Sequence, residues 1–139
     1  MHYSSNFEAP PSLPDEDSVA ALVIRVDEVP STNDMARDLL ESPAFDIPHL
    51  TTVLARTQTR GRGRLGRTWS TLPGRSLTAS TVVRLPSTPA LRDALPWVLI
   101  AQALATRAAV AARLQDLGHR VDVKWPNDVL VDSSRKIAG

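Results

Sequence analysis

The segment QTRGRGRLGRTW, from Gln58 to Trp69, contains too much glycine for a helix or a regular strand, so we expect an irregular loop here. Its glycines let the backbone approach a ligand closely, and successive backbone N–H groups can form an anion-binding nest. Five arginines in or beside the segment would repel one another without an anion: Arg56, Arg60, Arg62, Arg64 and Arg67. Arginine also makes bidentate hydrogen bonds to phosphate and carboxylate groups. The segment therefore predicts a binding loop for a phosphate or carboxylate.

Two common phosphate-binding patterns do not fit this segment. A Walker A loop needs Gly-Lys followed by Ser or Thr, and a dinucleotide-binding GxGxxG turn opens a helix, whereas a strand is expected here. A solvated or RNA-binding segment stays open as an alternative, because arginine–glycine tracts also bind RNA. The short length of the segment and the strands expected on both sides of it favour the anion-binding loop.

Strands and a helix are expected on the N-terminal side of the loop. Ala20–Val26 and Thr51–Thr57 are apolar and β-branched enough for strands, and Ser31–Glu41 has the apolar spacing of a short helix. Ser31 and Asp34 resemble a capping box at the start of that helix. Its buried stripe would consist of Met35, Ala36, Leu39 and Leu40.

On the C-terminal side, Ser76–Leu85 alternates as a half-buried strand does. One face would carry Leu77, Ala79, Thr81, Val83 and Leu85, and the other Ser76, Thr78, Ser80, Val82 and Arg84. Pro86 and Pro89 mark a connection, and Pro96–Leu117 is a long helix with proline in its first turn and Gly118 at its end. Two further strands, Val121–Trp125 and Val129–Val131, precede a hairpin loop at residues 132–135 and a last strand at Lys136.

Helices alternating with tight antiparallel connections predict an α+β fold built on a mixed, largely antiparallel sheet with packed helices. The sequence has 139 residues, a net charge of +1 and no cysteine, so disulfides and thiolate metal sites are excluded. A cytoplasmic location fits this composition. Residues 1–18 have the composition of a disordered tail and not of a signal peptide, and residues 19–139 would form one domain.

Two further features concern the membrane and the C-terminal end. The apolar stretch Trp97–Ala112 is interrupted by Gln102 and Arg107, which favours a packed helix over a membrane span. The last strand begins just before Gly139, so the sheet would lack a strand, and we expect a fragment of a longer protein.

Three shorter motifs could also carry chemistry, and each has a purely structural alternative. KWPND, residues 124–128, groups a cation, an indole and two oxygen-bearing side chains suited to ribose, Mg²⁺ or phosphate, but Pro-Asn-Asp also makes an ordinary turn. Lys136, in RKIAG, could lie partly desolvated over a reaction centre or could be a solvated edge lysine. Ser31-Thr32-Asn33 offers donors and acceptors, but would cap the helix in any case.

Taken together, STN, Q-x-x-GRGRxGRxW, KWPND and RK-[IL]-AG, in this order, resemble the catalytic domain of biotin protein ligases. The resemblance runs from Val26 to Gly139, the N-terminal part of that domain, and implies the class II aminoacyl-tRNA synthetase/biotin ligase-like fold. It also implies a reaction in which biotin and MgATP form biotinyl-5′-AMP. A lysine of the biotin carboxyl carrier protein domain of a biotin-dependent carboxylase, such as acetyl-CoA carboxylase, then accepts the biotin.

The resemblance implies a role for each matching residue. Biotin would contact Ser31, Thr32, Asn33, Gln58, Arg62, Gly63, Arg64 and Lys136. The nucleotide would contact Arg62, Arg64, Arg67, Trp69, Lys124 and Asn127, and Asp128 would bind the metal. Lys136 and Arg64 would be catalytic, although the hairpin before Lys136 is a residue longer than in similar sequences.

Several expectations about partners and alternatives follow. We expect no DNA binding, because no helix-turn-helix precedes the first strand, and no membrane; a homodimer of the intact enzyme is possible. The fragment alone would be inactive. A lipoate or other acyl ligase of the same fold is one alternative, and a non-catalytic anion- or RNA-binding module is another.

Overall fold

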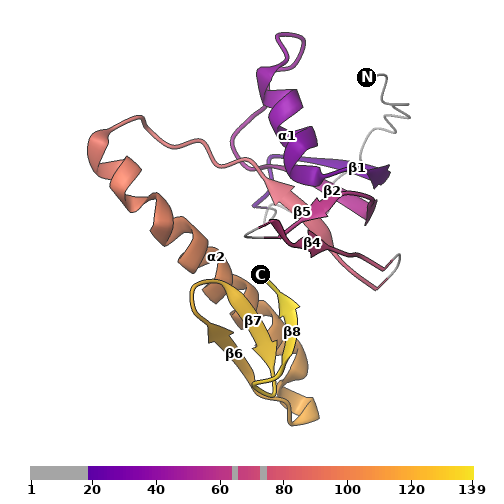
Figure 1. Ribbon diagram of the computed structural model, residues 1–139. Coiled ribbons are helices and arrows are strands. Elements are labelled where there is room, and N and C mark those ends of the chain that lie inside the picture. Colours follow the sequence, from indigo (N-terminus) through magenta and orange to yellow (C-terminus); the bar gives the residue numbers. More distant parts are fainter. Residues whose placement is uncertain (1–18, 64–65, 73–74) are drawn as a thin grey trace. The chain divides into compact units, whose positions relative to one another are not determined.

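The computed structural model describes residues 19–63, 66–72 and 75–139 (Figure 1). The predicted tail at residues 1–18 lies outside the described residues. The chain divides into two compact units, one ending at Arg84 and the other beginning at Leu85. Each unit is described by itself.

The first unit is a mixed three-stranded sheet with one helix. The sheet has the order β1-β2-β5, formed by β1 (Leu22–Val29), β2 (Thr51–Gln58) and β5 (Thr78–Thr81). β1 and β2 are parallel, whereas β5 is antiparallel to β2. A parallel pair needs a crossover connection, which contains helix α1 (Thr32–Glu41). The predicted mixed sheet is therefore confirmed.

Helix α1 begins as the sequence predicts. Ser31 has extended backbone angles, and its Oγ accepts a hydrogen bond from the Asp34 backbone N at 3.4 Å, so Ser31 is the N-cap. The buried side of the helix contains Met35, Ala36 and Leu39, as expected, together with Thr32. The prediction for Leu40 was wrong, because this side chain is 43% exposed. The core beneath α1 is completed by Val29, Ile47, Val53, Ala55 and Val82.

Strand β5 is shorter than predicted, and the structure shows which of its two predicted faces is buried. It covers Thr78–Thr81 and not the whole of Ser76–Leu85. The alternation is real, but Thr78 and Val82 are buried while Leu77 is 85% exposed. The pairing register explains this, because Ser80 lies opposite Val53 and therefore shares its buried face. Alternation gave the period of the strand but not the face that meets α1.

The Arg-Gly segment contains a short ribbon, which corrects the expectation of a wholly irregular loop. β3 (Gly61–Arg62) pairs antiparallel with β4 (Thr68–Trp69), with Gly61 opposite Trp69. A Cβ atom on Gly61 would lie against the carbonyl oxygen of Trp69, closer than van der Waals contact allows, so glycine permits this pairing. Gly66, in the described part of the turn, has a φ of 72°.

The second unit consists of helix α2 (Pro89–Leu114), a 3-10 turn (Gln115–Leu117) and an antiparallel sheet of order β6-β7-β8. Its strands are β6 (Val121–Lys124), β7 (Asp128–Val131) and β8 (Arg135–Ala138). They confirm the predicted hairpins and the last strand, although the first ends at Lys124 and not at Trp125.

Helix α2 begins earlier than the predicted start at Pro96. Thr88 is its N-cap and accepts from the Leu91 backbone N at 3.3 Å, while Pro89 occupies the first turn. Thr is a much better N-cap than Leu95, the residue before Pro96, and Pro is favoured at the first helical position. Pro96 therefore lies inside the helix, and the expected connection at Pro89 is helical.

The C-terminal part of α2 packs against its own sheet. Val110, Ala111 and Leu114 contact a cluster made of Val121, Val129 and Val131. Arg107, near the middle of the helix, donates from Nε to the Val121 carbonyl oxygen at 3.0 Å, which ties α2 to β6. By length and composition alone, Leu91–Leu117 could also cross a membrane.

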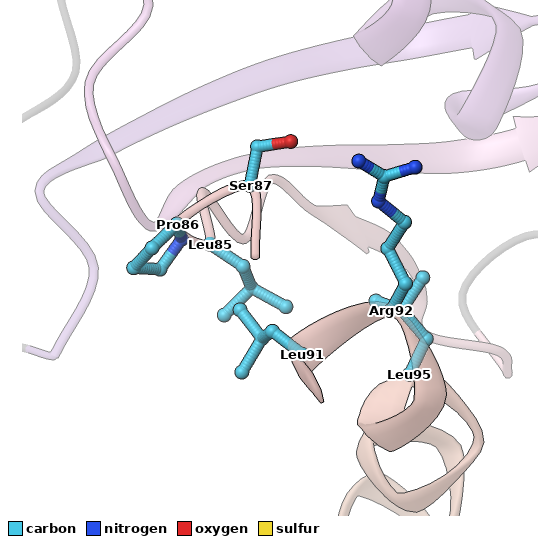
Figure 2. Close-up of a pocket in the computed structure, with 6 residues that line it drawn as sticks. All are labelled: Leu85, Pro86, Ser87, Leu91, Arg92 and Leu95. Carbon is cyan, nitrogen blue, oxygen red and sulfur yellow. The ribbon is translucent and has the colours of Figure 1, made fainter. Parts of the chain in front are cut away.

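An open pocket of about 170 Å³ lies at the start of α2 (Figure 2). Three leucines supply most of its apolar lining, which consists of Leu85, Pro86, Ser87, Leu91, Arg92 and Leu95. None of the residues that the sequence predicts for ligand binding lines it.

Candidate functional site

The predicted site residues of the first unit lie where α1 begins and β2 ends. β1 and β2 are parallel with Val29 opposite Gln58, so the chain leaves β1 beside the last residue of β2. Gln58 accepts at Oε1 from the Thr32 backbone N at 2.8 Å and from Thr32 Oγ1 at 3.1 Å. Ser31 and Thr32 are both buried, whereas Asn33 is exposed. The STN motif and Gln58 thus form one polar cluster.

Ser80 joins this cluster from β5, and sequence reasoning missed it. Its Oγ lies 2.8 Å from Thr32 Oγ1 and 2.6 Å from Asn33 Oδ1. A hydroxyl carries one hydrogen, so it can donate to only one of these two acceptors at a time. The only sequence signal for Ser80 was its place in an alternating strand, which did not reveal the face it shares.

Thr78 lies two positions before Ser80 and therefore on the same face of β5. Its side chain is buried, and its Oγ1 has no hydrogen-bond partner among the described residues. A buried hydroxyl without a partner costs about 1–3 kcal/mol. A polar group of a ligand could remove that cost.

Backbone hydrogen bonds hold the start of the Arg-Gly segment beside this cluster. The Thr59 and Arg60 backbone N atoms donate to the carbonyl oxygens of Val29 and Pro30, at 3.1 and 2.9 Å. The Gln58 backbone N donates to Thr71 Oγ1 at 3.0 Å, so Thr71 fixes the other side of the segment. Both sides of the ribbon are therefore anchored near α1.

The described arginines of the segment take different positions. Arg62 donates from Nη2 to Asp34 Oδ1, which also accepts from Arg37 Nη1 at 3.4 Å. Asp34 thus binds arginines, whereas a full capping box would direct its carboxylate back to Ser31. Arg67 is exposed, and its carbonyl oxygen accepts from the Gly63 backbone N at 2.7 Å. The predicted site residue Arg64 lies outside the described residues.

Trp69 is half-buried at the base of the ribbon, in β4. It follows the segment directly, as the sequence predicts. No described contact places its ring against a ligand site, so its role with the nucleotide stays a prediction.

The second unit brings together three of the remaining site residues. Lys124 and Asp128 face each other across the β6–β7 turn, which contains Asn127. Lys136, on β8, forms an ion pair from Nζ to Asp128 Oδ1 at 2.8 Å. Trp125, at the turn, is 75% exposed and not part of the core. The ion pair between Asp128 and Lys136 therefore links the KWPND motif to the RKIAG motif.

The opposite end of this sheet carries a second charged cluster around Asp132. The pKa of its carboxyl is lowered, first by the Arg120 backbone N–H at 3.1 Å and then by Arg135 and His119, while desolvation opposes them. Asp132 lies at the far end of β7 from Asp128. It therefore stabilises the hairpin and is not part of the Lys136 cluster.

Residues 24–139 match the family model described as the biotin/lipoate A/B protein ligase family. The chain belongs to this family. It is 32% identical over 115 residues to the bifunctional ligase/repressor BirA of Bacillus spizizenii, covering 83% of this chain and 33% of the relative. It is 34% identical over 117 residues to the biotin–[acetyl-CoA-carboxylase] ligase of Mycobacterium tuberculosis, covering 83% of this chain and 42% of the relative.

Solved structures of family members have the same fold. The biotin protein ligase of Leishmania major in complex with biotin has a TM-score of 0.61 at 31% identity, covering 79% of this chain and 46% of that one. The ligase of Aquifex aeolicus in complex with biotin and ATP has a TM-score of 0.57 at 29% identity, covering 78% and 41%. The chain thus spans between a third and a half of the length of these relatives. The resemblance to the N-terminal part of the catalytic domain is confirmed.

Proposed function

We propose that the full-length protein carrying this sequence is a biotin protein ligase that uses biotin and MgATP. The polar cluster of Thr32, Gln58 and Ser80 beside Arg62 carries the proposal, because it places neutral hydrogen-bonding groups next to a cation. Biotin has the same two parts, a neutral cyclic urea and a carboxylate. Support comes also from the relatives, which are named as biotin ligases and crystallised with biotin and ATP.

The first proposed step joins two anions. The biotin carboxylate oxygen attacks the α-phosphorus of ATP, the bond to the leaving pyrophosphate breaks, and biotinyl-5′-AMP forms. Cationic groups must offset the repulsion and stabilise the charge that develops at phosphorus. Arg62, Arg64 and Lys136 would supply this charge, and the Gly63 region would supply backbone N–H groups. Lys124, Asn127, Arg67 and Trp69 would bind the nucleotide, and Asp128 is a candidate ligand for the Mg²⁺ of MgATP.

The second proposed step transfers biotin to a protein. A lysine amine of a biotin carboxyl carrier protein domain attacks the acyl carbon, and AMP leaves. Two relatives are named as acetyl-CoA-carboxylase ligases, which supports a carboxylase as the acceptor. The adenylate hydrolyses easily, so the Arg-Gly segment would have to shield it from water. A cytoplasmic location and dimerisation remain predictions, as does the absence of DNA binding.

Biotin-dependent exchange of labelled pyrophosphate into ATP tests this function. We expect the full-length protein to catalyse it with biotin and not with lipoate. Exchange with lipoate alone would make the protein a lipoate ligase. Salt-sensitive RNA binding without any exchange would favour the non-catalytic alternative.

Lys136→Ala tests the proposed catalytic role within that assay. We expect adenylate formation to be lost while biotin binding stays mostly intact, because the charge of Lys136 matters most in the transition state. Isothermal titration with biotin, beside single-turnover adenylation, separates the two effects. A large loss of biotin affinity with unchanged turnover would contradict the role.

A further inference from the structure

The pairing of β8 with β7 sets the face of the sheet on which Lys136 lies, and β8 contains a bulge directly after this residue. Val129 pairs with Ala138, but Leu130 pairs with Lys136, so β8 has one extra residue, Ile137, at this point. The two pairs nearest the turn, Val131 with Arg135 and Leu130 with Lys136, are in regular register, so Lys136 shares the face of Leu130. Val129 and Val131 are both buried against α2, so the face of Leu130 and Lys136 points away from that core. The bulge follows Lys136 and brings Ala138 opposite Val129 on the face that packs against α2, so Lys136 itself lies on the other face of the sheet.

That other face carries Asp128. Residues alternate along β7, so Asp128 and Leu130 share the face opposite to Val129 and Val131. Lys136 Nζ lies 2.8 Å from Asp128 Oδ1, and the two side chains are 40% and 31% exposed. The strand register and the ion pair therefore both place the lysine on the same face.

Gly139 leaves space for this ion pair. A Cβ atom at Gly139 would lie 2.6 Å from Asp128 Oδ1 and 2.7 Å from Lys136 Nζ. Those atoms are the ends of flexible side chains, so a methyl group there would displace the two charged groups and not the backbone. Gly139 therefore offers a way to disturb the pair without removing either charge.

We propose that Asp128 is a positioning residue that holds the Lys136 ammonium group in place for the acyl-adenylation step. This inference rests on the proposed function, because Lys136 acts only if the protein forms an adenylate. The lysine ammonium group sits on a flexible four-carbon chain. An ion pair with an adjacent strand removes much of the conformational freedom of this chain before substrate binds. The metal-binding role for Asp128 predicts a different outcome, a changed dependence on Mg²⁺.

The experiment compares Asp128→Asn, Gly139→Ala and Asp122→Asn in the full-length protein. Asp122 is the control, because it is a carboxylate of the same sheet paired with Arg120 at 2.9 Å. We expect Asp128→Asn to lower kcat of biotin-dependent pyrophosphate exchange by about tenfold to a hundredfold, the range that a misplacement near 1 Å can produce. The Mg²⁺ concentration for half-maximal rate should stay unchanged, and Gly139→Ala should lower kcat in the same direction.

A double-mutant cycle adds a readout that a purely structural role would not give. Single-turnover adenylation at high enzyme concentration measures the small residual rate of Lys136→Ala, and if Asp128 acts through Lys136, Asp128→Asn should have little further effect on that rate. An unchanged kcat in Asp128→Asn, or fully additive effects, would overturn the proposal. A raised Mg²⁺ requirement with additive effects would assign Asp128 to the metal.

Chemical labelling tests the ion pair separately from activity. Reductive methylation followed by peptide mapping should modify Lys136 more slowly than Lys124 in the wild type, because the pair must open first. In Asp128→Asn the Lys136 rate should rise several-fold, with Lys124 unchanged. Equal Lys136 rates in both proteins would overturn the proposal even if exchange is absent, whereas absent exchange with the expected labelling would overturn only the proposed function.

Discussion

One side-chain oxygen atom of Gln58 accepts two hydrogen bonds from the first turn of α1. This atom, Oε1, is the acceptor for both donors of Thr32, and Thr32 is only 3% exposed. A buried backbone N–H needs a partner, so the first turn of α1 depends on an amide at the end of β2. This side chain therefore has a structural role whether or not it also contacts a ligand.

Gln58→Met should destabilise the full-length protein by about 1–3 kcal/mol, because the Thr32 N–H would lose its acceptor while the side-chain volume stays similar. Urea denaturation measures the change. Gln102→Met is the matched control, since Gln102 is exposed on α2, and it should have almost no effect. Equal stabilities for the two variants would mean that another group satisfies Thr32.

Most residues of the candidate site could be predicted from the sequence, but Ser80 could not. STN, Gln58, KWPND and Lys136 stand in motifs whose residue types suggest their chemistry. Ser80 and Thr71 are ordinary polar residues of a strand and a loop. Their partners follow from the β2–β5 register and from the path of the Arg-Gly segment, which depend on contacts distant in the sequence.

The turn of the β7–β8 hairpin holds two non-glycine residues in an unfavourable backbone conformation. Asp132 and Ser133 both have positive φ angles, of 50° and 59°, and the Ser134 backbone N donates to the Val131 carbonyl oxygen at 3.3 Å. These are the features of a type I′ turn, for which Asp-Gly is favoured over Asp-Ser. A non-glycine residue in this region costs about 1 kcal/mol.

Ser133→Gly should therefore stabilise the protein by up to about 1 kcal/mol. The loss of the exposed hydrogen bond from Ser133 Oγ to Asp122 at 3.3 Å subtracts little from that gain. Thermal unfolding of the full-length protein would show a higher midpoint. A lower midpoint would mean that the Asp122 contact outweighs the backbone strain.

The same hairpin should be sensitive to acid through Asp132. Its pKa in the folded protein is lowered below 3.8, so its carboxylate stabilises the fold at pH values above about 4 and this stabilisation is lost as the pH falls through the folded pKa. Asp132→Asn should be less stable than the wild type at pH 7. The difference should shrink below about pH 4, as amide hydrogen exchange of β7 and β8 would show.

Elements with a strong local signal were predicted well, and those set by distant contacts were not. Ser31 and the spacing of Met35 and Leu39 defined α1, and the Pro-Asn-Asp turn separated β6 from β7. The start of α2 was placed too late because Pro96 seemed a natural boundary, although Thr88 caps the helix. The β3–β4 ribbon was missed because its pairing depends on Gly61 fitting beneath Trp69.

At the scale of the whole molecule, helix α2 packs against protein at its C-terminal end and exposes large apolar side chains nearer its N-terminal end. Its C-terminal part covers the β6-β7-β8 sheet, while Leu95, Trp97 and Leu104 are at least half exposed. The helix is long and apolar enough to cross a membrane. However, Arg107 donates to the backbone of β6 from its middle, which favours a helix that packs against protein.

We therefore expect the full-length protein to stay in the supernatant when lysed cells are washed with alkaline carbonate and centrifuged. A peripheral or water-soluble protein is released by this treatment, whereas a membrane-spanning helix keeps its protein in the pellet. Retention in the pellet would contradict the packed-helix interpretation. An unrelated membrane-spanning protein in the same cells serves as the control.

The β7–β8 hairpin has two places where a change in length leaves Lys136 on the same face of the sheet, the turn and the bulge. Adding or removing a residue in the turn at residues 132–134 alters a connection and can leave the pairing of β7 with β8 beyond it intact. Deleting Ile137 would remove only the extra residue, because Lys136 would stay opposite Leu130 and Ala138 opposite Val129 in a regular ladder. Length variation among related chains should therefore be found in the turn and at the bulge, while Lys136 keeps its place opposite Leu130.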